Sequence, residues 1–213
     1  MPHDDHGPTD DQAHPGLHED DWPPLASRVN GVTVRYAREQ DHAAIAHLTV
    51  ASYVDGGHIH PEDTYIENLQ DVAGRASLAR VLVGEVELEV GDGDDREART
   101  VVAGSVVLTL PGMPMSETAR DGELEFRMLA VDPSVQRRGV ARALVRAAID
   151  RAEHLEGIEA VVLTTMETMT SAHRLYASEG FVRVPERDWR LSDIGQEPTD
   201  GTDQLYWVFR RLV

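Results

Sequence analysis

The chain has 213 residues, of which 41% are hydrophobic, and its 38 acidic and 20 basic side chains give a formal net charge of −18. This length suits one domain, and the excess of acid argues against a nucleic-acid partner, which needs a basic face. Cysteine is absent, which excludes disulfides, a thiol nucleophile and thiolate metal sites. No apolar run approaches the roughly 20 residues of a membrane span, so no membrane partner is expected.

The first 28 residues are polar and rich in proline, and they include four histidines and seven acidic residues. Such a segment cannot bury enough apolar surface to offset the entropy of ordering. We therefore expect a disordered, acidic, histidine- and proline-rich tail over residues 1–28 and a single domain over residues 29–213. The spacing of the histidines matches no specific metal site, and no metal is expected.

Strands and helices alternate in the first half of this domain. Alternating or continuous apolar runs predict three strands, over 32–36, 79–90 and 100–110. Capping residues followed by helical periodicity predict two helices, over 43–54 and 65–75. A turn rich in glycine and aspartate separates the last two strands, which indicates a hairpin.

The second half of the domain continues this alternation. Its predicted strands cover 123–131, 160–165, 181–184 and 204–212. Its predicted helices cover 140–156 and 170–179, and a glycine follows each of them, as is common at helix ends. Strands interleaved with helices predict an α/β fold built on a mixed sheet.

The stretch from Leu129 to Ala148 has the order strand, loop, glycine and helix. The first N–H groups of a helix have no internal partner and lie at the positive end of its dipole, so they bind anions. Gly139 lets a ligand approach the backbone closely, and diphosphate is the usual ligand of such a loop. Three arginines, Arg137, Arg138 and Arg142, add positive charge in a chain that is otherwise acidic.

Two motifs carry a resemblance to a known family. Residues 136–141, Gln-Arg-Arg-Gly-Val-Ala, resemble the Q/R-x-x-G-x-G/A loop of the GCN5-related N-acetyltransferases (GNAT), with Ala141 in place of the second glycine. Residues 173–181, from His-Arg-Leu-Tyr to Gly-Phe, resemble the LY-x-x-x-GF signature of the same family. The resemblance implies a single GNAT-like α/β (α+β) domain, with a mixed, mostly antiparallel central sheet flanked by helices.

The same resemblance implies an activity. It implies an acetyl-CoA-dependent N-acetyltransferase, in which a primary amine attacks the acetyl group directly within a ternary complex. The acceptor is expected to be an amine on a small molecule or a peptide, and a homodimer is left open. A cytosolic cofactor, together with an N-terminus that lacks the pattern of a secretory signal, indicates a cytoplasmic location.

The resemblance also implies how acetyl-CoA is held. The backbone of the strand end, formed by Leu129, Ala130 and Val131, is expected to pair with the pantetheine arm. The N–H group of Leu129 is expected to polarise the thioester carbonyl. The diphosphate is expected to contact the backbone amides of Arg137, Arg138, Gly139, Val140, Ala141 and Arg142.

Two side chains are the candidates for proton transfer. Tyr176 lies where the family has its helix tyrosine, and a phenol with a pKa of about 10 suits an acid for the departing thiolate. Glu125, eleven positions before Gln136, matches the strand glutamate of the family's histone-acetylating branch, which implies a base. Each has an alternative reading: Tyr176 could be an aromatic core residue, and an ion pair between Glu125 and Arg127 would make a poorer base.

One position departs from the family pattern. Many members have asparagine seven positions before the helix tyrosine, where this chain has Met169. The side-chain contact that this asparagine makes to the cofactor is therefore not expected from residue 169, and Thr168, Thr170 and Ser171 are the alternatives for it. The helical region before the second strand resembles the part of the family that varies and shapes the acceptor pocket. Its candidates for acceptor specificity are Tyr53, Asp55, His58, His60 and Tyr65.

Two other functions are open on the same scaffold. The domain could bind acyl-CoA as a regulator without turnover, or it could transfer a different acyl group, such as succinyl or propionyl. Thiol release with a panel of amines, and a comparison of acyl donors, would separate these alternatives. A P-loop nucleotide hydrolase is disfavoured because the Gly-Lys-Ser/Thr element is missing.

Overall fold

The computed structural model of the chain describes Trp22, Leu25 and the ranges 27–90, 96–195 and 203–213. Most of the predicted tail and of the predicted hairpin turn after Val90 lies outside the described residues. Within those ranges, no helix is both long enough and apolar enough to cross a membrane.

The described strands are β1 (Ser27–Val29), β2 (Val32–Tyr36), β3 (Arg80–Val90), β4 (Glu97–Thr109), β5 (Glu123–Val131), β6 (Ala160–Met166), β7 (Val182–Arg183), β8 (Trp189–Arg190) and β9 (Leu205–Leu212). The α-helices are α1 (His42–Asp55), α2 (Tyr65–Gln70), α3 (Val72–Leu78), α4 (Val140–His154) and α5 (Thr170–Ser178). Short 3-10 helices are η2 (Glu39–Asp41), η3 (Pro133–Val135), η4 (Pro185–Arg187) and η5 (Leu191–Ile194).

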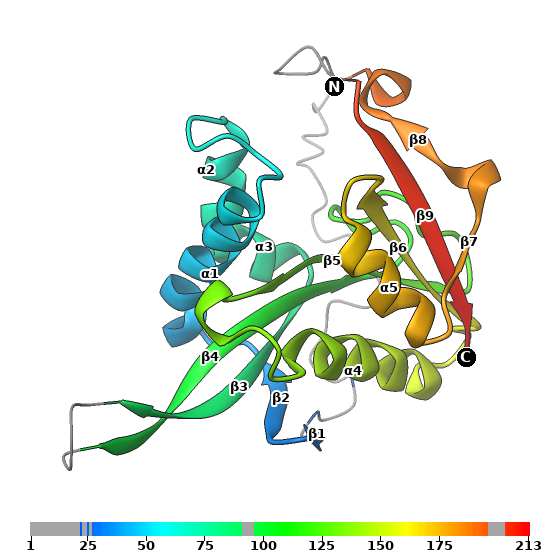
Figure 1. Cartoon of the computed structure of the whole chain (residues 1–213). Coiled ribbons are helices and arrows are strands. Elements are labelled where there is room, and N and C mark those ends of the chain that lie inside the picture. Colours follow the sequence, from blue (N-terminus) through cyan, green and yellow to red (C-terminus); the bar gives the residue numbers. More distant parts are fainter. Residues whose placement is uncertain (1–21, 23–24, 26, 91–95, 196–202) are drawn as a thin grey trace, which may run out of the picture.

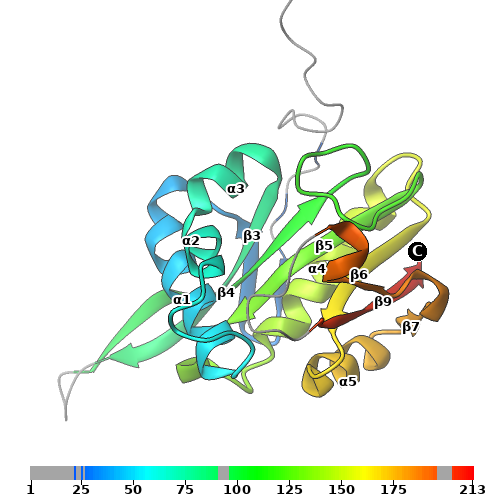
Figure 2. The same cartoon turned by 90° about the horizontal axis from the view of Figure 1, so that it is seen from above.

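The strands form one sheet in the order β1-β2-β3-β4-β5-β6-β9-β7, and β8 pairs with β9. Of the described pairs, β5 with β6 is parallel, and the others are antiparallel. Helices α1, α2 and α3 lie on one side of the sheet, and α4 and α5 lie on the other (Figures 1 and 2). This arrangement confirms the expected mixed, mostly antiparallel sheet flanked by helices.

Side chains that alternate in direction along the strands build a core on each side of the sheet. On β4, Val106 and Leu108 pack into the core that α4 covers. Val107, between them, packs into the other core together with Ile45 of α1. The period-2 pattern of the strand therefore explains why helices are needed on both faces.

The start of α4 packs closely against the sheet because glycine occupies the facing positions on β3 and β4. A Cβ atom at Gly104 would lie 2.7 Å from Cγ1 of Val140, and a Cβ atom at Gly84 would lie 3.0 Å from the same atom. A larger residue at either position would push the helix away from the sheet. These close contacts fix where α4 begins relative to the neighbouring strand β5.

The predicted tail extends too far, because Trp22, Leu25 and residues 27–28 belong to the folded domain. Trp22 and Leu25 are buried in the core beneath α4, with 4% and 8% of their surface exposed. Residues 27–29 form β1, which pairs with β2 through a turn at Asn30 and Gly31, both with positive φ. The prediction averaged composition over the whole segment, and so it missed the apolar residues that anchor its end.

The predicted helix over 65–75 is divided into α2 and α3. Asp71 follows α2 with φ −75° and ψ 69°, and its carboxylate accepts a hydrogen bond from the N–H of Gly74 at 2.8 Å. Asp71 therefore caps a new helix instead of continuing the first. The other predicted elements occur with slightly different boundaries, and β1 and β8 were not predicted.

Candidate active site

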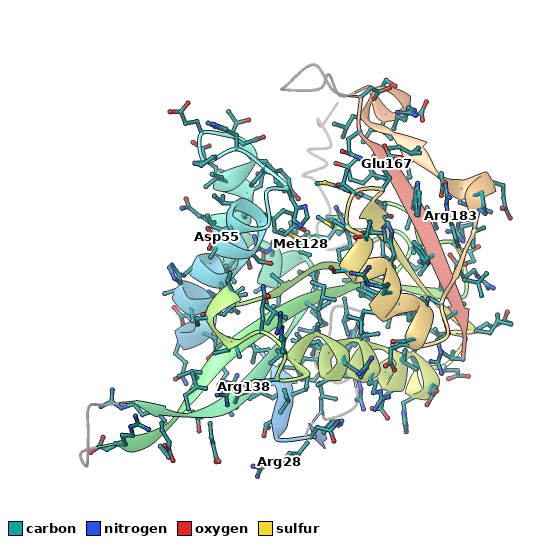
Figure 3. The ribbon with its side chains drawn as sticks, in the orientation of Figure 1. Arg28, Asp55, Met128, Arg138, Glu167 and Arg183 are labelled. Carbon is teal, nitrogen blue, oxygen red and sulfur yellow. The ribbon has the colours of Figure 1, made fainter. Side chains whose placement is uncertain are left out.

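The parallel strands β5 and β6 separate in the middle of the sheet. Their pairing ends at Phe126 and Leu163, although both strands continue. Beyond Phe126, the edge of β5 that faces β6 has no ladder partner among the described strands. Figure 3 shows Met128 in this region, between α1–α3 on one side and β6 with α5 on the other. An unpaired edge offers N–H and C=O groups to an extended ligand.

A β-bulge marks the point where β5 turns away from β6. Between the pairs that β4 makes through Ser105 and Val107, β5 contributes one residue more than β4. Met128 lies in this bulge with a φ of +52°, which is unusual for a residue with a side chain. The predicted pantetheine-binding residues, Leu129–Val131, follow directly on the unpaired edge.

The loop between β5 and α4 leaves a row of backbone N–H groups free. Gly139 caps α4 with a φ of +80°, which favours glycine, and a Cβ atom built on it would meet no atom within 4 Å. Within the described ranges, no protein acceptor takes the backbone N–H groups of residues 137–142. These groups begin a helix of 15 residues, at the positive end of its dipole. The open space and the free donors fit a diphosphate.

The three arginines of this stretch differ in their surroundings. Arg137 and Arg138 are exposed and have no acidic partner among the described residues, and Figure 3 shows Arg138 beside the start of α4. Arg142 instead donates from Nε to Oε1 of Glu179 at 2.7 Å, and Arg146 binds the same carboxylate. The side chain of Arg142 thus ties α4 to the end of α5, and its backbone amide is left for the predicted contact.

Tyr176 of α5 lies in the core beside α4. It is 5% exposed, and its ring packs against Phe126, Phe181 and Phe209 at centroid distances of 5.7, 6.1 and 6.0 Å. Burial raises the pKa of the Tyr176 phenol above its ordinary value. No protein group in the described part of the chain hydrogen-bonds its hydroxyl. The ring is thus a core element, while the hydroxyl is available to another partner.

Glu125 of β5 is fully buried beneath the loop that precedes the strand. Its Oε2 accepts a hydrogen bond from the Ser116 hydroxyl at 3.1 Å and three more, at 3.0 Å, from the backbone N–H groups of residues 117–119. Its Oε1 has no hydrogen-bond partner among the described residues and lies 3.8 Å from Nε of Arg127. The carboxylate therefore holds this loop in shape, and its predicted role as a base stays a prediction.

A cavity of about 420 Å³ opens beside the bulge, between α1 and α2 on one side and β6, β8 and β9 on the other. Its aromatic and ionisable lining residues are Tyr53, Tyr65, Trp189, Tyr206, His58, Asp63, Glu117 and Arg127. Met128 also lines it, so the cavity reaches the unpaired edge of β5. The hydroxyl of Thr164 on β6 is buried without a partner in the described chain, and Thr164 is part of the lining. The position and the lining suit a polar acceptor.

Ionisable groups around this cavity have perturbed acidity. Burial raises the pKa of Tyr206 to about 12, and it also raises the pKa of Tyr53 and of Tyr65. Burial raises the pKa of Glu117 as well, and the positive charge of Arg127, its ion-pair partner, offsets only part of this rise. Perturbed titratable groups in a cavity are typical of an active site.

Only some of the residues predicted to shape the acceptor pocket line the cavity. Tyr53, His58 and Tyr65 line the cavity, whereas Asp55 and His60 are not part of its lining. The described residues contain no group of three or more His, Cys, Asp or Glu side chains placed to hold a metal ion.

Sequence reasoning missed part of the cavity. Glu117 lies between the predicted strands 100–110 and 123–131, and the sequence pattern indicates no role for it. Trp189 and Tyr206 stack with ring centroids 4.4 Å apart, although they lie 17 positions apart in the sequence. No local pattern could have predicted this pair, because it depends on β8 folding back along β9.

Comparison with known proteins places the chain among acetyltransferases. The model described as the acetyltransferase (GNAT) family matches residues 43–181. N-acetylaspartate synthetase of Danio rerio is 38% identical over 81 residues, which are 38% of this chain and 28% of that protein. Mycothiol acetyltransferase of Sanguibacter keddieii is 30% identical over 162 residues, which are 76% of this chain and 47% of that protein. The chain thus spans less than half the length of these curated relatives.

Solved structures share the fold. The structure of yncA from Salmonella typhimurium with its cofactor acetyl-CoA aligns with a TM-score of 0.57 at 21% sequence identity. The alignment covers 85% of this chain and 94% of that chain. A likeness at this level of identity concerns the fold, which agrees with the mixed sheet and flanking helices described above.

Proposed function

Since the chain belongs to the GNAT acetyltransferase family, we propose that it transfers the acetyl group of acetyl-CoA to a primary amine. The amine attacks the thioester directly while both substrates are bound. The observation that carries this proposal is that three features follow one another along β5 and the loop after it. They are the unpaired edge of β5, the free N–H groups at the start of α4, and the cavity that opens beside the bulge.

Two backbone segments hold acetyl-CoA in this proposal. The free edge of β5 at Leu129–Val131 pairs with the extended pantetheine arm, as an added strand would. The N–H groups of residues 137–142 bind the diphosphate, and the exposed guanidinium groups of Arg137 and Arg138 add positive charge. The N–H group of Leu129 donates to the thioester carbonyl and stabilises the oxyanion that forms there.

Transfer also requires that the amine lose protons and that the departing thiolate gain one. In this proposal Tyr176 gives its phenolic proton to the thiolate. One observation supports the assignment: the hydroxyl of Tyr176 is free of protein partners in the described ranges. Glu125 is the sequence-based candidate for the base, and because its carboxylate is buried outside the cavity lining, it would act through an intervening group.

The acceptor in this proposal is a primary amine on a small molecule or a peptide, bound in the cavity beside Met128. Aromatic walls and two carboxylates, Asp63 and Glu117, favour a cationic amine over an anionic acceptor. A cytoplasmic site of action is part of the proposal because acetyl-CoA is the donor.

The proposal is tested by incubating the protein with acetyl-CoA and a panel of amines: tyramine, spermidine, L-lysine and an alanyl dipeptide amide. Thiol release is followed spectroscopically, and the acetylated amine is identified by mass spectrometry. Equal amounts of free thiol and acetylated amine are expected. Tight CoA binding without thiol release would favour a binding domain, and faster turnover of succinyl-CoA or propionyl-CoA would favour another donor.

A further inference from the structure

We infer that Glu117 is the catalytic residue that binds the ammonium group of the acceptor and removes its proton. The inference rests on the proposed function, since it names the proton acceptor for the same transfer. It assigns Glu125 a different part, that of a positioning residue that holds the loop of Glu117 in place.

Glu117 is a carboxylate that a substrate in the cavity can reach. Its side chain is 40% exposed and forms part of the cavity lining. The side chain of Glu125 has 0% of its surface exposed and is not part of the lining. Asp63, the other lining carboxylate, already accepts a hydrogen bond from the N–H of Tyr65 at the start of α2. A base must come within hydrogen-bond reach of the amine, directly or through one water, and this requirement favours Glu117.

An ion pair with Arg127 fixes the Glu117 carboxylate beside β5. Arg127 directly precedes the bulge residue Met128, and both of them line the cavity. The next residue, Leu129, carries the amide that is proposed to bind the thioester carbonyl. An amine bound by Glu117 therefore lies on the side of the cavity where the acetyl group is expected.

The loop that carries Glu117 is held from several directions. Glu125 accepts the backbone N–H of Glu117 and of the two residues that follow it. Arg127 donates from Nη1 to the carbonyl oxygen two residues before Glu117 at 2.5 Å, and Arg187 donates to the carbonyl oxygen directly after it. A catalytic group whose position is fixed before the substrate binds loses less entropy in the transition state. This gives the buried Glu125 a purpose without contact to the substrate.

The ionisable groups that face Glu117 are Arg127 and Glu125 on β5, Tyr65 on α2 and Tyr206 on β9. Partial burial raises the pKa of Glu117, the charge of Arg127 lowers it, and the charge of Glu125 raises it. The net effect is a pKa above the ordinary value of a glutamate. A glutamate with a raised pKa is a stronger base than an ordinary one. The rate should therefore fall as the pH drops through this raised value, because protonated Glu117 cannot accept the proton.

The transfer balances with these two residues. The ammonium gives one proton to the Glu117 carboxylate, and the neutral amine attacks the thioester carbon. The C–N bond forms, and the C–S bond breaks with its electron pair on sulfur, which takes the phenolic proton of Tyr176. The nitrogen loses its second proton as the amide forms, which restores Tyr176, and Glu117 releases the first proton to solvent.

The test compares Glu117→Gln with a matched control, Glu67→Gln, which changes an exposed glutamate of α2 outside the cavity lining. Acetyl transfer to the fastest amine of the panel is measured between about pH 5 and 7, where most of each amine is protonated. Glu117→Gln should lower kcat by roughly 10²–10⁴. Its remaining rate should fall about tenfold per pH unit toward acid pH over the whole range, because only the small fraction of free amine still reacts, whereas the wild-type rate should level off above the raised pKa of Glu117. The CoA affinity and melting temperature of Glu117→Gln should stay near wild type, and the control should match wild type throughout.

A second variant, Glu125→Gln, separates proton removal by Glu117 from the positioning of its loop by Glu125. It should lower the melting temperature, because the loop loses its anchor, but its remaining rate should still level off above the raised pKa of Glu117, as in wild type. A wild-type rate and pH profile in Glu117→Gln would overturn the inference. Loss of this levelling-off in Glu125→Gln alone would also overturn it and would return the base role to Glu125.

If the wild-type protein turns over no amine of the panel, the proposed function fails, and binding decides the role of Glu117. Tyramine is then titrated into the CoA-bound protein. Binding weakened by about tenfold or more in Glu117→Gln would support an amine site at this carboxylate. Equal binding by both proteins, or no binding by either, would contradict it.

Discussion

Replacing Glu125 by alanine should destabilise the domain because this buried carboxylate supplies the hydrogen bonds of a whole loop. Its Oε2 accepts four hydrogen bonds at 3.0–3.1 Å, and its side chain has 0% of its surface exposed. The alanine variant leaves the Ser116 hydroxyl and three backbone N–H groups without their acceptor. Leaving these donors without an acceptor lowers the free energy of unfolding, and it does so more where water cannot replace the carboxylate.

The magnitude follows from the number of bonds and from their shared acceptor. A single hydrogen bond to a charged group contributes roughly 1.5–3 kcal/mol, but four bonds to one oxygen are not additive, so the loss should be about 3–5 kcal/mol. In a domain of this size, this corresponds to a fall in melting temperature of about 6–20 °C. Glu125→Gln keeps one acceptor oxygen and the side-chain volume, and so it should cost about half as much.

Thermal unfolding followed by circular dichroism would measure this loss in the protein without ligand. Glu67→Ala is the matched control, since it removes an exposed glutamate from α2 and should change stability by about 0.5 kcal/mol or less. A Glu125→Ala variant that melts within about 2 °C of wild type would refute the structural role of this carboxylate.

Three further predictions concern the acid, the chain start and the stability at low pH. Tyr176→Phe should lower single-turnover acetyl transfer by roughly 10²–10⁴ with CoA affinity unchanged, whereas a rate within about twofold of wild type would remove Tyr176 as the acid. Trp22→Ala should cost about 3–5 kcal/mol in urea unfolding, because the ring is 4% exposed in the core; a cost below about 1 kcal/mol would contradict this packing. Burial alone would raise the pKa of Glu123, but hydrogen bonds from Arg187 and Arg210 outweigh it and hold the pKa below its ordinary value. The stability from this ion pair is therefore present above about pH 4.5 and lost as the pH falls through the lowered pKa, and Glu123→Gln should show a smaller acid loss in thermal melts.

The sequence predicted most of the fold because strong periodic patterns coincide with buried faces. The strand over 123–131 and the helix that begins at Val140 were placed correctly, since their apolar residues meet the two cores described above. Short elements were missed where tertiary packing supplies the stability. Trp22 and Leu25 are single apolar residues in a polar segment, and only the core beneath α4 explains their burial.

The proposed donor site lies on one continuous stretch of the sequence, whereas the cavity proposed for the acceptor does not. The loop at Gly139 and the strand end after Met128 are continuous in the sequence, so a motif can report them. The acceptor cavity combines α1, α2, β5, β6, β8 and β9 with the loop that holds Glu117, and its composition depends on how these elements meet. The family resemblance implied Glu125 as the base, but it could not show that the carboxylate is enclosed by its own preceding loop.

Calorimetric titration of CoA tests most directly whether the donor binds at the start of α4. Wild type is compared with Gly139→Asp, which puts a side chain and a negative charge where the diphosphate is expected. Gly31→Asp is the matched control, since Gly31 has a φ of +82° and Gly139 one of +80°, and a Cβ atom at either meets nothing within 4 Å. We predict one CoA bound per chain, affinity weakened by about tenfold or more in Gly139→Asp, and near wild-type affinity in the control. Equal affinity in all three proteins, or no CoA binding by wild type, would contradict the proposed donor site.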